Sequence, residues 1–145
     1  RESLCQAGIS NDYTDIGRTS LFIQQAKTAL EIGGQKNPTH WYHYFKDYAL
    51  DYMFSQCTLQ FPAEELCHPA ILKLRRHDAE NHTEYHRTLK SYLEHKFSVT
   101  NTAEALFIHR TTLIHRLKKI QGLCSLDLDD PRTVQHLMLS FSLLA

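Results

Sequence analysis

The sequence predicts a mainly α-helical protein, in which a C-terminal helical bundle follows a partial, mostly helical segment that could also hold some β-structure. Apolar residues recur three and four positions apart over several stretches of the 145-residue chain, as they do on the buried face of a helix. Residues that begin helices stand before some of these stretches, most clearly Asp130 followed by Pro131. The 42% hydrophobic and 22% charged residues are typical of a folded globular protein.

The first 60 residues are expected to be partly irregular and partly helical. Residues 8–17 are rich in turn-forming residues and predict irregular structure. Residues 18–32 have one apolar face and predict a helix that ends at Gly33-Gly34, because glycine tolerates the left-handed conformation found at helix C-termini. The aromatic residues 41–45 fit either a short strand or the start of the next helix. That helix would carry Tyr48, Leu50, Met53 and Phe54.

The remaining helix boundaries follow from prolines and capping residues. Pro62 and Pro69 each suit the first turn of a helix, where a missing N–H does no harm. The polar residues 77–82 predict a linker, after which Thr83 is expected to cap a helix over residues 84–96. These boundaries divide the chain into residues 1–60, connecting helices and a linker at 61–82, and a domain at 83–145.

Residues 98–120 predict two short helices joined by a tight turn. Ser98 is expected to cap the first helix and His109 the second, while Ala103 is small enough to let the helices touch. Gly122 is expected to end the second helix. Two helices in this arrangement are typical of a helix-turn-helix, whose second helix enters the major groove of DNA. Phe107 stands in the turn, where a positive φ would be costly for phenylalanine.

The second helix, about residues 110–121, carries side chains suited to DNA. Base contacts are expected from its N-terminal half, and phosphate contacts from the basic residues beyond it. The full predicted DNA-binding set is Ser98, Thr100, His109, Arg110, Thr111, Thr112, Ile114, His115, Arg116, Lys118 and Lys119. Residues 98–122 hold four basic residues and one acidic residue, so their net charge is +3 although the whole chain has none. A second basic cluster, Lys73, Arg75 and Arg76, fits an ordinary solvated helix face.

Residues 102–117, followed by residues 126–131, closely resemble the C-terminal helix-turn-helix domain of the PucR/CdaR family of bacterial transcriptional regulators. Residues 89–95 match the helix that precedes the motif in that family, and phenylalanine is expected in its turn. The resemblance covers about residues 82–145 and implies a cytoplasmic regulator that binds double-stranded DNA as a homodimer. Relatives commonly carry Asn at the position of Thr111, a basic or polar residue at Ile114 and Tyr at His115. The DNA sequence that relatives recognise therefore cannot be transferred.

A weaker likeness lies upstream. Gly8-Ile9-Ser10 and the helix that carries Ala26, Ala29 and Leu30 resemble the end of the GGDEF-like domain that often precedes this module. The likeness implies that residues 1–60 are the remnant of such a domain. We expect the chain to be a fragment of a longer regulator, in which an effector small molecule could act through upstream domains.

Other function classes have less support. No P-loop, GxSxG, dinucleotide fingerprint or GGDEF-type signature is present, so neither an enzyme nor a cofactor is expected. The four cysteines form no CxxC pair, and His82 and His86 lack a third ligand, so no metal site is expected. No apolar run approaches the length of a membrane span. The alternative is an interaction or dimerisation module, because the last helix carries Leu137, Met138, Phe141, Leu143 and Leu144.

Overall fold

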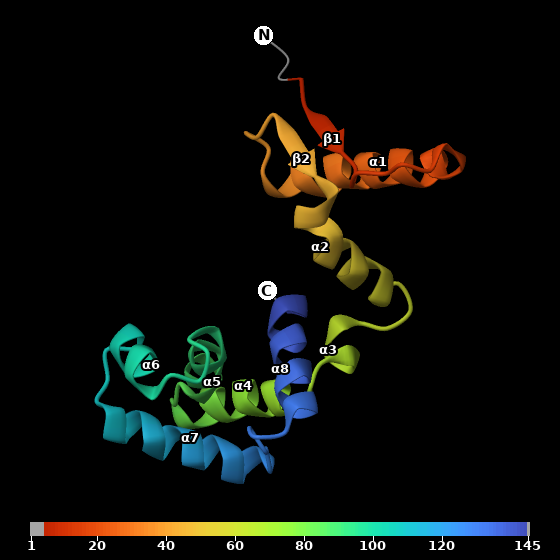
Figure 1. Ribbon diagram of the computed structural model, residues 1–145. Helices are drawn as coiled ribbons and strands as arrows, with labels where there is room; N and C mark the ends of the chain where they lie inside the picture. Colours follow the sequence, from red (N-terminus) through yellow and green to blue (C-terminus); the bar gives the residue numbers. More distant parts are fainter. Residues whose placement is uncertain (1–4, 145) are drawn as a thin grey trace. The chain divides into compact units, whose positions relative to one another are not determined.

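The computed structural model describes residues 5–144 and contains two compact units, which divide between Gln60 and Phe61 (Figure 1). The predicted mainly α-helical fold is confirmed, because 69% of the structure is helical and the described sheet has only two short strands. The N-terminal unit contains that sheet. The C-terminal unit is helical throughout its described elements.

The N-terminal unit is a strand–helix–strand arrangement with a further helix. β1 (Ala7–Ile9) pairs in parallel with β2 (Tyr42–Tyr44), and α1 (Thr19–Lys36) connects the two strands after a 3-10 turn, η1 (Ile16–Arg18). The prediction of irregular structure is wrong for Gly8 and Ile9, which belong to β1. Their strand pairs with β2, about 35 residues further along the chain, and no local pattern shows such a pairing. α2 (Phe45–Cys57) follows β2 directly. Residues 41–45 therefore supply both the strand and the start of the helix.

Gly33 lies inside α1 and does not end it. The predicted stop at Gly33-Gly34 is wrong, since α1 continues to Lys36. Gly33 is buried against the His43 ring of β2, and a Cβ atom at this position would lie 2.4 Å from that ring. The His43 side chain is itself buried and its Nδ1 lies 3.1 Å from the Tyr48 hydroxyl. The glycine therefore permits close packing of α1 on the sheet.

The C-terminal unit is a bundle of helices around one hydrophobic core. Its described helices are α3 (Ala63–Leu66), α4 (Pro69–Asn81), α5 (Tyr85–Glu94), α6 (Val99–Ala105), α7 (Arg110–Cys124) and α8 (Pro131–Leu143). The core is built from apolar side chains of α4 to α8 and of the connection before α8. They include Ile71, Leu74, Leu89, Leu93, Ala103, Leu113, Leu117, Ile120, Leu126, Leu137 and Phe141.

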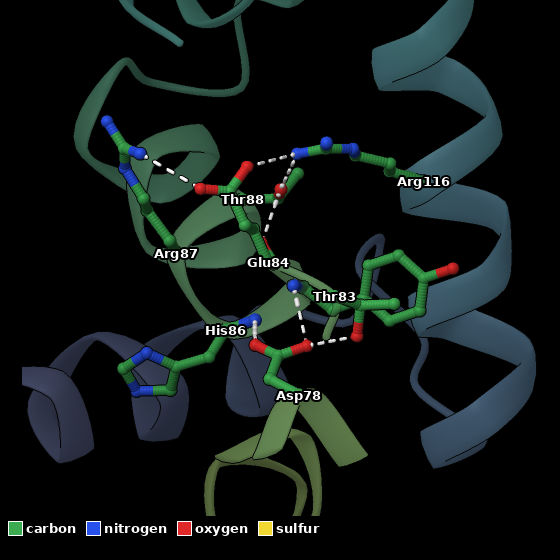
Figure 2. A network of polar contacts seen from close by, with 8 residues as sticks. Asp78, Thr83, Glu84, His86, Arg87, Thr88 and Arg116 are labelled. Carbon is green, nitrogen blue, oxygen red and sulfur yellow. Dashed lines mark hydrogen bonds and ion pairs between the residues drawn. The ribbon is translucent and has the colours of Figure 1, made fainter. Parts of the chain in front are cut away.

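α5 is capped by a side chain of the preceding helix. The Asp78 carboxylate of α4 accepts hydrogen bonds from the Thr83 hydroxyl (2.5 Å) and from the N–H groups of Tyr85 (2.9 Å) and His86 (2.8 Å) (Figure 2). Thr83 was wrongly predicted as the cap, because its hydroxyl is a donor to Asp78. The predicted linker at residues 77–82 is also wrong. α4 continues to Asn81, and the polar run joins α4 to α5 through the Asp78 carboxylate.

α8 begins with the predicted Asp130-Pro131 pair. The Asp130 carboxylate accepts hydrogen bonds from the N–H groups of Arg132 (3.3 Å) and Thr133 (2.9 Å), which confirms the cap. The Thr133 hydroxyl donates a further bond of 2.7 Å to the same carboxylate. The hydroxyl and N–H of Thr133 stabilise the charged form and lower the pKa of Asp130.

Helix ends in the bundle do not use glycine. α4, α5, α6 and α7 are each followed by a non-glycine residue with a left-handed backbone, and no glycine within residues 5–144 has a positive φ. These residues are His82, Lys96, Phe107 and Ser125. Gly122, predicted to end α7, instead lies exposed inside it, and a Cβ atom there would meet nothing within 4 Å.

Two histidines with lowered pKa values lie in the bundle. His68 Nδ1 accepts a hydrogen bond from Ala70 N–H (3.2 Å) and so caps α4. Burial lowers the pKa of His68, and the neighbouring His136 lowers it further. Burial also lowers the pKa of His86, whose Nε2 accepts a hydrogen bond from Arg75 Nε (3.2 Å). Both rings are used as acceptors, so the neutral form is favoured.

We expect Gly122→Ala and Gly33→Ala to have opposite effects. Gly122→Ala should raise the free energy of unfolding by about 1 kcal/mol, because alanine stabilises the exposed interior of a helix. Gly33→Ala should lower it by about 1–3 kcal/mol, because the added methyl group overlaps the His43 ring. Urea denaturation followed by circular dichroism measures both changes. A destabilised Gly122→Ala variant would contradict the open surroundings of this position.

We expect the bundle to lose stability as the pH falls from about 7.5 to about 5.5, across the ordinary histidine pKa. The lowered pKa values of His68 and His86 mean that the unfolded chain binds more protons in this range, so acid favours unfolding. His68→Asn keeps a capping acceptor but cannot titrate, so it should lose less stability than the wild type. Urea denaturation at both pH values measures the loss. An equal loss in the two proteins would show that His68 does not contribute.

Candidate nucleic-acid interface

α6 and α7 form a helix-turn-helix with both predicted caps in place. The Ser98 hydroxyl accepts a hydrogen bond from Asn101 N–H (3.3 Å) at the start of α6. His109 Nδ1 accepts one from Thr111 N–H (3.4 Å) at the start of α7 and lies 2.8 Å from the Thr111 hydroxyl. Ala103, expected to be the small residue at the helix crossing, is 3% exposed. The local geometry of the motif is therefore fixed by its own residues.

α7 has one fully buried side and one fully exposed side. Leu113, Leu117 and Ile120 are buried in the core. Successive residues of an α-helix are rotated by about 100° around its axis. The side opposite these three residues therefore carries other residues that are spaced three or four positions apart. We call this set the outward stripe; it consists of Thr111, His115, Lys118 and Gly122, all exposed. Exposed flanking positions are Arg110, Thr112, Ile114 and Lys119.

The basic side chains of this surface are available to a ligand. Within residues 5–144, Arg110, Lys118 and Lys119 form no ion pair. A groove of about 350 Å³ lies beside α7, between its residues Thr112, His115 and Arg116 and the chain at residues 82–85. Cationic groups with no internal partner are suited to the phosphates of a nucleic acid.

Arg116 differs from the other predicted phosphate contacts. Its guanidinium lies 3.2 Å from the Glu84 carboxylate and donates a 3.2 Å hydrogen bond to the Thr88 hydroxyl (Figure 2). The other Glu84 oxygen pairs with Arg87 at 3.1 Å. The phosphate contact of Arg116 stays a prediction, and without DNA this side chain joins α7 to α5. Glu84 and Thr88 were missed because no local pattern links them to a residue about 30 positions away.

Two predicted residues lie at the start of α6. Thr100 is exposed, whereas Ser98 is half-buried and its hydroxyl already accepts the capping bond. Phe107, in the turn, has a φ of 55°, so the costly backbone conformation considered for this residue is present. Its side chain is 93% exposed. The sequence pattern did not predict that the Phe107 side chain would be exposed at a position with a strained backbone.

In the part of the chain that the structure describes, no three His, Cys, Asp or Glu side chains lie close enough together to hold a metal ion. Among the same residues, no helix combines the length and the apolar composition that crossing a membrane requires.

Comparison with known proteins agrees with this geometry. Residues 85–143 match the family described as the PucR C-terminal helix-turn-helix domain. The chain is 31% identical over 123 residues to the Carbohydrate diacid regulator of Escherichia coli (strain K12), covering 85% of this chain and 31% of that protein. It is 33% identical over 143 residues to the Proline-responsive transcriptional activator PutR of Bacillus subtilis (strain 168), covering 94% of this chain and 34% of that protein.

A third relative is similar over a shorter stretch. The Purine catabolism regulatory protein of Bacillus subtilis (strain 168) is 42% identical over 53 residues, which are 37% of this chain and 10% of that protein. The chain spans 31% and 34% of the lengths of the first two relatives. No solved structure matches the chain. The helix-turn-helix of α6 and α7 and the match over residues 85–143 together show that the C-terminal unit carries a helix-turn-helix domain of the PucR C-terminal family.

Proposed function

We propose that this chain is the DNA-binding part of a transcriptional regulator and that α7 enters the major groove of double-stranded DNA. The observation that carries the proposal is the outward stripe, a polar and basic surface opposite the buried side of a helix-turn-helix recognition helix. An α-helix with its side chains is about 10–12 Å across, which matches the width of the major groove, about 12 Å. The family match over residues 85–143 supports the same function.

The proposed contacts follow from position on α7. Arg110 and Thr111 lie in the first turn, where side chains of a recognition helix reach base edges, and His115 lies one turn further on the outward stripe. Lys118 and Lys119 are placed to bind phosphates. Thr112 and Ile114 flank the stripe and would contact the walls of the groove, while Thr100 would contact the backbone from the start of α6.

We also propose that residues 1–60 are the end of a GGDEF-like domain and that the whole regulator is a homodimer controlled by a small molecule. The parallel β1–α1–β2 arrangement supports an origin in a larger α+β domain. The names of two relatives refer to a carbohydrate diacid and to proline, which supports control by a metabolite. A dimer would place two recognition helices on half-sites about 34–36 Å apart.

An interaction module without sequence-specific DNA binding is the second candidate. Met138 is 49% exposed and Leu139 is 42% exposed on α8, so the bundle presents apolar surface outside the helix-turn-helix. Such surface is used in protein contacts. The two candidates differ in whether removal of basic groups on α7 changes DNA binding.

The first experiment compares two double variants, each of which loses two basic side chains. Arg110→Ala with Lys118→Ala should abolish gel retardation of the DNA upstream of the protein's own gene, because both groups lie on the proposed interface. The control, Lys73→Ala with Arg76→Ala, removes two exposed basic groups from α4 and should leave retardation nearly unchanged. Circular dichroism should be the same for both variants. If both double variants lose retardation equally, the protein binds DNA only through its general positive charge. If the wild type does not retard the DNA, the interaction module is favoured.

The second experiment measures the dependence of affinity on salt. Lys118→Gln should reduce the slope of log affinity against log salt concentration by about one, because one phosphate contact is lost. Arg116→Gln should leave the slope unchanged, because Arg116 is paired with Glu84. Each variant is compared with the wild type by fluorescence anisotropy at several salt concentrations. A reduced slope for Arg116→Gln would show that Arg116 leaves Glu84 and binds a phosphate.

A further inference from the structure

We propose that Phe107 is a DNA-contact residue, whose ring packs against apolar atoms of the duplex, either thymine C5-methyl groups or deoxyribose carbons. This inference rests on the proposed function and adds a contact from the turn to those of α7. Two properties of Phe107, its backbone conformation and its exposure, are each unfavourable for the folded chain. Its place beside α7 identifies the partner.

The backbone of Phe107 adopts a conformation that favours glycine. α6 ends with two hydrogen bonds, from Ile108 N–H to the Ala103 carbonyl (3.0 Å) and from Phe107 N–H to the Glu104 carbonyl (3.1 Å). This pair of bonds is the Schellman motif, which requires a left-handed residue and usually has glycine there. Phenylalanine at φ 55° carries a steric penalty between Cβ and the carbonyl oxygen.

The Phe107 side chain recovers none of this penalty inside the fold. It is 93% exposed, the highest value among the large apolar side chains of residues 5–144. Phe97 shows the contrast, because it also has a positive φ of 62° but packs its ring against Tyr92, 5.5 Å away. Phe97 stabilises the end of α5, whereas Phe107 has no aromatic partner in the described chain. Strain without an internal contact points to an external one.

The place of Phe107 in the chain identifies DNA as the partner. Phe107 is three residues before Arg110, the first residue of α7, so the two Cα atoms lie within about 11 Å of each other. When the start of α7 enters the major groove, Phe107 reaches the same groove or its edge. The C5-methyl group of thymine is exposed in this groove, and phenylalanine is among the side chains that contact it.

The experiment exchanges Phe107 for residues that favour the left-handed conformation. Phe107→Gly and Phe107→Asn should both decrease the unfolding equilibrium constant, by about threefold for Asn, because the steric penalty is relieved. Both should weaken binding to the upstream DNA by about tenfold, as expected for the loss of a partly buried aromatic contact. The salt dependence of binding should not change, because no charge is lost.

Ser125 provides a matched control at the other end of α7. It is exposed and also left-handed, with φ 52°, and it lies 15 residues from Arg110, or about 22 Å along the helix. Ser125→Gly should relieve the same kind of strain without any change in DNA affinity. Phe107→Leu should retain part of the affinity because its side chain is apolar.

The outcomes separate this inference from the proposed function. Weaker DNA binding together with equal or greater stability supports a contact from Phe107, since a purely structural residue would lose stability when replaced. Wild-type affinity in Phe107→Gly and Phe107→Asn overturns the contact and leaves the proposed function intact. No binding by the wild type overturns both. Replacing thymine by uracil in the duplex should weaken the wild type but not Phe107→Gly if the partner is the methyl group, and should affect neither if it is deoxyribose.

Discussion

The bundle depends on the burial of one side of α7. Leu113, Leu117 and Ile120 are all less than 9% exposed and contribute to a core shared with α4, α5 and α8. Full burial of one such side chain stabilises a fold by about 1.5–3 kcal/mol. Since the three residues lie on one side of the helix, their burial leaves the outward stripe exposed. The same packing that stabilises the domain therefore determines which residues of α7 are exposed for the proposed contact with DNA.

Polar contacts around α5 set the position of α7 more finely. Asp78 binds the first N–H groups of α5, and Glu84, just before the helix, binds Arg116 of α7 (Figure 2). Arg116 is 24% exposed and Glu84 is 51% exposed, so this ion pair contributes modestly to stability. The pair and the hydrogen bond from Arg116 to Thr88 lie between one flank of α7 and α5.

Local signals in the sequence were sufficient for the motif itself. Ser98, His109 and Asp130 each cap a helix through residues two or three positions away, so their roles follow from nearby sequence. Some incorrect predictions concern residues whose partners lie outside their own helix or turn. Others assumed that a helix ends at glycine. Gly33 packs on His43, and β1 pairs with β2. Gly122 was predicted as a helix end because glycine favours such ends, yet Ser125 takes that place.

The hydrogen bonds of Asp78 also have a mechanical consequence. α4 is a continuous helix of 13 residues, and its last turn is bound to the first turn of α5 through one carboxylate. The connection from Thr83 to Glu84 cannot extend freely while these bonds are intact. The last turn of α4 and the first turn of α5 are therefore held together, and Glu84, at the start of α5, is in turn bonded to Arg116 of α7. A substitution of Asp78 would therefore free the start of α5 and loosen the joint between two consecutive helices, not only one helix cap.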